Sequence, residues 1–233
     1  EKMDRKAQTL KGALLLIALG GLVSFLIWKI SDNMSSAIII GGIAVAVVFI
    51  VSRRVWPYLL MGGLGAVGIA AFVHFVISGM ENSENFRFRR VIAWLNPEKY
   101  ASDLAYQTMQ ALYAIGSGGL FGKGLGNSTQ KMVLPEAQND MIFSIICEEL
   151  GIFGVCIVMV LFVMLLYRLL VIAENAPDLY SSLMVTGIFA HIAIQVVLNI
   201  AVVTNTIPNT GVTLPFISYG GTSILFLMAE MGL

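Results

Sequence analysis

Long apolar runs constrain the fold of this chain more than any other feature. A helix of about 20 apolar residues matches the ~30 Å hydrocarbon core of a bilayer, where every backbone polar group must find a partner inside the protein. Such runs recur along the sequence, which is 58% hydrophobic and only 12% charged. The sequence therefore predicts an all-α integral membrane protein, a multi-pass helical bundle. The predicted spans are residues 12–30, 36–52, 57–78, 141–170, 182–203 and 218–233.

Positive charges predict the orientation of these spans. One cluster precedes the first span, a second separates the second span from the third, and a single arginine closes the fourth. With strict alternation all of them fall on one side, which is expected to be the cytoplasm. These residues are Lys2, Arg5, Lys6, Lys11, Arg53, Arg54 and Arg168. The long loop of residues 80–140 is then external, together with residues 204–216.

The ends and the overall charge of the chain narrow its class further. It begins without an initiating Met and stops inside an apolar run, so we expect a piece of a longer membrane protein. Its formal net charge is zero, which predicts no nucleic-acid partner. Cys147 and Cys156 lie in one apolar run without the spacing of a metal site and are expected to be small core residues.

The external loop is predicted to be partly helical. Residues 86–95 place apolar side chains on one face and arginines elsewhere, which is typical of an amphipathic helix at a membrane surface, with Trp94 at headgroup level. Asp103 is predicted to cap a second helix over residues 104–115. The glycine-rich GSGGLFGKGLG sequence lacks the Ser or Thr that follows Lys in a phosphate-binding loop, so turns and close packing are expected there.

Carboxylates near the start of the fourth span point to function. In a continuous helix, Asp140, Ser144, Glu148 and Gly151 would share one face, which is too polar for lipid and should look into the protein or a water-filled cleft. Acids inside an apolar span are costly and usually functional. Asp140 and Glu136 could supply a general base, or oxygen ligands for a divalent cation such as Mg²⁺ or Mn²⁺. Buried acids could equally line an ion or proton path, so the residues alone leave enzyme and transporter open.

Two other groups of residues carry weaker predictions. The loop's basic residues could bind a pyrophosphate or a lipid headgroup, or could simply be solvated near an anionic leaflet. Gln195 and Asn199 are one helical turn apart in the fifth span, which favours hydrogen bonds between helices.

Two long segments carry a resemblance to a known family. AIGSGGLFGKGLGNSTQKMVLPEAQNDMIFSIICEELGIFG and NTIPNTGVTLPFISYGGTS resemble the two signatures of the FtsW/RodA/SpoVE family. FRFRRVIAWLNP and YQTMQALYAIG also look like segments of that family, so the resemblance covers nearly the whole chain. QK followed by LPEA is closer to the division and sporulation branch, FtsW and SpoVE, than to the elongation branch.

The resemblance implies a function. Members are expected to have ten spans, of which about six would lie here, and to polymerise lipid II into glycan strands with release of undecaprenyl pyrophosphate. The expected location is the bacterial cytoplasmic membrane, with the active site facing outward. Expected partners are a class B penicillin-binding protein transpeptidase and other division or elongation proteins. A lipid II flippase and a non-catalytic division scaffold are the alternatives.

The resemblance also implies roles for individual residues. Asp140 matches the family's essential external acid and is expected to be catalytic. The expected substrate-binding residues are Arg90, Lys131, Glu136, Glu149 and Ser218.

Overall fold

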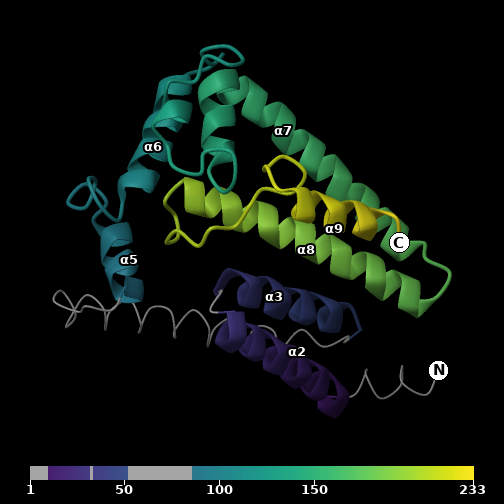
Figure 1. Cartoon of the computed structure of the whole chain (residues 1–233). Helices are drawn as coiled ribbons and strands as arrows, with labels where there is room; N and C mark the ends of the chain where they lie inside the picture. The colour runs from purple at the N-terminus through teal and green to yellow at the C-terminus, as the bar shows by residue number, and fades with distance from the viewer. Residues whose placement is uncertain (1–9, 32–33, 52–85) are drawn as a thin grey trace. The chain divides into compact units, whose positions relative to one another are not determined.

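The computed structural model describes residues 10–31, 34–51 and 86–233, and these residues are helical or irregular, with no strand among them. Figure 1 follows the helices in chain order by colour. They are α2 (Leu10–Ser31), α3 (Met34–Val51), α5 (Phe86–Leu95), α6 (Tyr106–Gly118), the 3-10 helix η1 (Gln130–Met132), α7 (Ile142–Glu174), α8 (Leu179–Val203) and α9 (Gly221–Met231). Two of them, α7 and α8, are long and apolar enough to cross a membrane.

Five of the six predicted spans coincide with helices, and the third, residues 57–78 with its closely spaced glycines, lies outside the described residues. α7 starts one residue later than its predicted span and runs four residues further, and α8 starts three residues earlier than predicted. α9 is shorter than its predicted span because residues 218–220 belong to the preceding loop. The fold class predicted from the apolar runs is confirmed: this is an all-α membrane protein.

The chain forms two compact units, and several long helices contribute to both. In the first unit, α2 and α3 pack closely: a Cβ added at Gly20 would lie 2.3 Å from the Cβ of Ala44. The hydroxyl of Ser24 donates to the carbonyl of Ala37 at 2.6 Å, which satisfies a polar group among apolar side chains. Small residues therefore bring these two helices together.

The second unit holds α5, α6, η1, the first part of α7 and the end of α8. α5 has the bounds predicted from its amphipathic pattern. Its buried Ala93 packs with Ala105 and Met109. The indole of Trp94 donates to the carbonyl of Asn205 at 3.0 Å, so this side chain joins two loops. That hydrogen bond ties the 80–140 loop to the 204–216 loop, in agreement with their predicted location on one side.

Two local predictions were wrong. α6 begins at Tyr106 rather than at residue 104, and it has no side-chain cap. Asp103 instead accepts a hydrogen bond from Arg89 at 3.1 Å, because the arginine competes for the carboxylate. α7 is not one continuous helix: Gly151, with φ of 66°, breaks it, and Figure 1 shows the sharp bend.

Candidate active site at the start of helix α7

Backbone hydrogen bonds join the glycine-rich loop to α7 on both sides of the break. A helix end leaves carbonyls without partners, and a helix start leaves N–H groups without partners. The carbonyls of Glu148 and Glu149 accept from the amides of Lys123 and Gly124, both at 2.9 Å. Beyond the break, the amides of residues 152 and 153 donate to the carbonyls of residues 119 and 120. The loop therefore completes the hydrogen bonding of both helix segments.

Glycines allow this close approach. A Cβ at Gly118 would lie 1.9 Å from the carbonyl oxygen of Cys147, and a Cβ at Gly122 would lie 2.2 Å from that of Glu149. A Cβ at Gly151 would lie 2.4 Å from the amide nitrogen of Gly122. The close packing predicted for the glycine-rich sequence is confirmed, and it occurs against α7.

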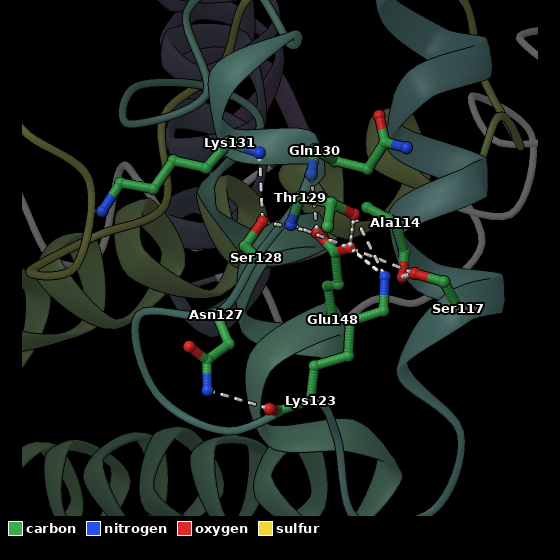
Figure 2. A network of polar contacts seen from close by, with 9 residues as sticks. All are labelled: Ala114, Ser117, Lys123, Asn127, Ser128, Thr129, Gln130, Lys131 and Glu148. Atoms are coloured by element: carbon green, nitrogen blue, oxygen red, sulfur yellow. Dashed lines mark hydrogen bonds and ion pairs between the residues drawn. The ribbon is translucent and has the colours of Figure 1, made fainter.

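Glu148 lies at the centre of this junction with no exposed side-chain surface. Its carboxylate forms an ion pair with Lys123 Nζ at 2.5 Å. Figure 2 shows the surrounding donors, which come from α6 and from the loop that precedes η1. They are Ser117 Oγ, Ser128 Oγ, the amide and Oγ1 of Thr129, and the amide of Gln130, which is the first residue of η1. The polar face predicted for this helix therefore does look into the protein, where Glu148 holds a loop.

Asp140 lies just before α7 and is buried, with 9% of its surface exposed. Its Oδ1 accepts from Gln107 Nε2 of α6 at 3.2 Å, and Gln107 in turn accepts from Asn209 Nδ2 at 2.8 Å. Burial raises the pKa of Asp140 above its ordinary value of 3.8, and the charge of Glu136 acts in the same direction. Hydrogen bonds to the carboxylate act against this rise. The result is a buried, oriented carboxylate with increased basicity.

The backbone around Asp140 is held by the second signature segment. Ser218, which is buried, donates its hydroxyl to the carbonyl of Asn139 at 2.6 Å and accepts from the amide of Leu214 at 2.7 Å. Asn199 of α8 has no exposed surface, and its Nδ2 lies 2.7 Å from the carbonyl of Asp140. These contacts fix Asp140 from segments 59 and 79 residues away in sequence.

A pocket of about 540 Å³ opens beside this junction. Three predicted substrate-binding residues line it together: Lys131, Glu136 and Glu149. Most of its other lining is apolar, from Leu125, Met132, Leu134, Ala137, Ile142, Ile145, Ile146 and Leu150. The pocket thus combines one cation and two carboxylates with a wall suited to a lipid chain.

The turn that leads from this pocket to Asp140 is strained. Glu136 has a positive φ of 53°, which is uncommon for a residue with a side chain. Its backbone carbonyl accepts from the backbone amide of Asn139 at 2.9 Å. Its carboxylate accepts from the side-chain Nδ2 of the same residue, Asn139. Strained backbone of this kind persists where the surroundings impose it, which is common at functional sites.

The structure does not bring all of the predicted site residues together. Arg90 lines a separate pocket of about 100 Å³ with Trp94, Gln107 and Asn209, so it does not share a pocket with Lys131. Asp140 lines neither pocket. Gln138 and Ile142, two residues before and after it, line the larger one, and its hydrogen-bond partner Gln107 lines the smaller one. Ser218 contacts backbone that precedes Asp140, and the substrate-binding role predicted for it stays a prediction.

Sequence reasoning assigned no site role to Gln107, Ser128 or Asn209, although Gln107 was noted as a polar residue of its helix. Lys123 was grouped with the loop cations that could bind an anion, whereas it pairs with Glu148. Asn199 was predicted only to join helices, and it does bond outside its own helix, to the carbonyls of Asp140 and Val212.

A protein-only metal site is absent from the part of the chain that the structure describes, where no three His, Cys, Asp or Glu side chains gather. Glu136 and Asp140 are near enough for the charge of Glu136 to raise the pKa of Asp140. Each of them already accepts a side-chain hydrogen bond, from Asn139 and Gln107 respectively. Two carboxylates do not complete a metal site, and a bound Mg²⁺ or Mn²⁺ stays a prediction.

Several known proteins are similar to this chain in sequence or in fold. Stage V sporulation protein E of Bacillus subtilis is 42% identical over 210 residues, which are 90% of this chain and 55% of that protein. The probable peptidoglycan glycosyltransferase FtsW of Coxiella burnetii is 38% identical over 229 residues, which are 96% of this chain and 59% of that protein. The chain therefore spans little more than half the length of these relatives, and both belong to the predicted branch.

Two solved structures agree with this. A chain in a peptidoglycan synthase complex, described as coordinating polymerization and crosslinking, matches 97% of this chain and 61% of its own with a TM-score of 0.72 and 27% identity. A mutant of the Thermus thermophilus rod shape determining protein RodA matches 99% of this chain and 59% of its own, with a TM-score of 0.61 and 25% identity. The family model described as cell cycle protein FtsW/RodA/SpoVE matches residues 1–233, and the chain belongs to this family.

Proposed function

We propose that this chain carries the catalytic part of a peptidoglycan glycosyltransferase that polymerises lipid II and releases undecaprenyl pyrophosphate during division or sporulation. The names of several relatives, including the FtsW proteins, support this activity. The site supports it independently, because a buried carboxylate is followed two residues later by Ile142, which lines a pocket that is partly charged and partly apolar.

The position of Asp140 is the observation that carries the proposal. A general base must hold its carboxylate in one orientation and have a pKa raised toward the working pH. Gln107 orients the side chain of Asp140, while Asn199 and Ser218 hold the backbone at and before it. Burial raises its pKa. These are properties of a base rather than of a surface carboxylate.

The reaction assigns one task to each group. The acceptor's 4-hydroxyl attacks the anomeric carbon of the donor sugar, and its proton passes to the carboxylate of Asp140 as the new C–O bond forms. The bond between the anomeric carbon and the pyrophosphate oxygen breaks, and the electron pair leaves with the pyrophosphate. Lys131 is the cation of the larger pocket and is suited to stabilise that developing charge. The pocket's apolar wall suits the start of the prenyl chain.

The geometry favours the enzyme over a flippase or a scaffold. A flippase that depended on Glu148 would need that carboxylate to face a path for the headgroup, whereas it is enclosed and bonded to protein donors. A scaffold has no need for a buried carboxylate at Asp140.

The decisive experiment uses the full-length protein with its transpeptidase partner and purified lipid II in detergent, where no transport can occur. We expect glycan polymer from wild type and a loss of about 10² to 10⁴ in rate with Asp140→Asn. Glu98→Gln, which alters an exposed carboxylate outside the site, is the matched control and should keep wild-type activity. Lipid II movement in sealed vesicles without any polymer from wild type would support the flippase instead.

The partner and the orientation are part of the same proposal. The structural match to a chain of a peptidoglycan synthase complex supports a protein partner, which we propose to be a class B penicillin-binding protein, with other division or elongation proteins. We also propose that the site faces outward across the bacterial cytoplasmic membrane. The contacts between the two predicted external loops support this.

A further inference from the structure

The enclosed carboxylate of Glu148 has no role in the chemistry proposed above. Its two oxygens accept from five side-chain and backbone groups in addition to the ammonium of Lys123. A carboxylate offers about four lone-pair positions, so none remains for a substrate or an ion. A buried charge whose lone pairs are all taken by protein donors acts on the structure of the protein rather than on a ligand.

Most donors of this network come from one short segment. The donors to Glu148 in this segment are Ser128, Thr129 and Gln130, and Gln130 is the first residue of η1. The hydroxyl of Ser128 also accepts from the amide of Lys131 at 3.0 Å, so one side chain connects Glu148 to Lys131. Figure 2 shows the Lys131 side chain extending away from this network. The carboxylate therefore fixes the backbone from which Lys131 reaches the pocket.

We propose that Glu148, paired with Lys123, is a positioning residue that fixes residues 128–131 so that Lys131 can bind a pyrophosphate group in the larger pocket. The identity of this ligand rests on the proposed function, whereas the positioning rests on the contacts alone. Loss of Glu148 should therefore resemble loss of Lys131 in binding, although Glu148 never touches the ligand.

Two variants separate positioning from simple stability. Glu148→Gln removes the charge but keeps the size, and Lys123 is one third exposed, so its ammonium can turn to water. Ser128→Ala is milder and removes the one hydroxyl that joins the carboxylate to the amide of Lys131. Ser117→Ala is the matched control, because Ser117 donates to Glu148 from α6, and its side-chain hydrogen bonds go to Glu148 and Ala114 rather than to residues 128–131.

Hydrogen–deuterium exchange of the full-length protein in detergent tests the positioning without any ligand. The amides of Thr129, Gln130 and Lys131 should exchange faster in Glu148→Gln. Glutamine has one acceptor oxygen where the carboxylate has two, so the amides of Thr129 and Gln130 cannot both keep their acceptors, and the amide of Lys131 depends on Ser128. In Ser128→Ala the Lys131 amide should show the largest change. In Ser117→Ala all three should match wild type. Unchanged exchange of this segment in Glu148→Gln would overturn the proposal.

Binding of undecaprenyl pyrophosphate to the same proteins tests the consequence. A hydrogen bond to a charged group supports about a tenfold or larger rise in Kd for Lys131→Ala. Glu148→Gln and Ser128→Ala should show a similar rise. Glu148→Gln combined with Lys131→Ala should be no weaker than Lys131→Ala alone, because both changes remove the same interaction. Lys123→Arg keeps the positive charge and should restore most of the binding that Lys123→Gln loses.

Additive effects in the double variant would contradict positioning through Lys131. Polymer synthesis by a wild-type protein that does not bind undecaprenyl pyrophosphate would overturn this proposal and leave the proposed function standing. Binding that depends on Glu148 in a protein that makes no polymer would do the reverse.

Discussion

Alanine at Gly118 should damage this protein much more than alanine at Gly116, two residues earlier in the same helix. The two glycines differ in what a new methyl group would meet. At Gly118 it would lie 1.9 Å from the carbonyl oxygen of Cys147, which is backbone and cannot rotate away. At Gly116 nothing lies within 4 Å. Both lie in α6, so the pair shares its helical context.

The magnitude follows from the geometry. Real Cβ contacts are essentially never shorter than 3.0 Å, so the end of α6 and α7 must separate by about 1 Å in Gly118→Ala. Overpacking of a tight interface costs about 1–3 kcal/mol. Gly116→Ala gains up to about 1 kcal/mol in helix preference. The two variants should therefore differ by roughly 1–4 kcal/mol in the free energy of unfolding.

Thermal unfolding of the full-length protein in detergent measures the difference. At about 2–4 °C per kcal/mol, Gly118→Ala should melt roughly 2–16 °C below Gly116→Ala. Its activity should also fall, because Glu148 is the next residue after Cys147 and its network holds the loop. Equal melting temperatures for the two variants would refute the close contact between α6 and α7.

Three further predictions follow from the site. Asp140→Asn should melt at or above the wild-type temperature at neutral pH. The raised pKa of Asp140 means that the folded state favours its protonated form, so the contribution of this one group to stability is greatest below about pH 3.8 and falls as pH rises through its folded-state pKa. Ser218→Ala should lower the free energy of unfolding by about 1–3 kcal/mol, because the amide of Leu214 loses its acceptor. The free energy of unfolding of Ser218→Cys is the comparison for Ser218→Ala. A cysteine at exposed Asn96 should react with a membrane-impermeant reagent in intact cells, and labelling only after lysis would contradict the external loop.

Local sequence patterns predicted the helices well. The amphipathic pattern of residues 86–95 set the bounds of α5, because that pattern depends only on near neighbours. The apolar runs that became α7 and α8 are long and apolar enough to cross a membrane, so hydropathy alone located both helices. Asp103 shows the limit of local reasoning: a capping residue was expected there, and Arg89 from 14 residues away took its carboxylate.

The site was predicted only in part, since its geometry depends on distant contacts. The motif match singled out Asp140, and the structure adds Gln107 and Asn199, which lie 33 and 59 residues from it in sequence. No periodicity indicates such pairs. The break at Gly151 was missed for a related reason: a glycine in an apolar run is usually tolerated by a helix, and here the loop at Gly122 makes the break favourable.

The break in α7 also changes how much of this helix has to cross a membrane. Residues 152–174 alone would extend about 35 Å as a helix, which already exceeds the ~30 Å hydrocarbon thickness. By length, the segment before Gly151 is not needed to traverse lipid. Glu148 and Glu149 belong to that surplus segment, so neither acid has to be carried through hydrocarbon. Because Gly151 breaks the 33-residue α7, the part after it is long enough to cross the membrane, and the part before it can hold Glu148 and Glu149 outside the hydrocarbon.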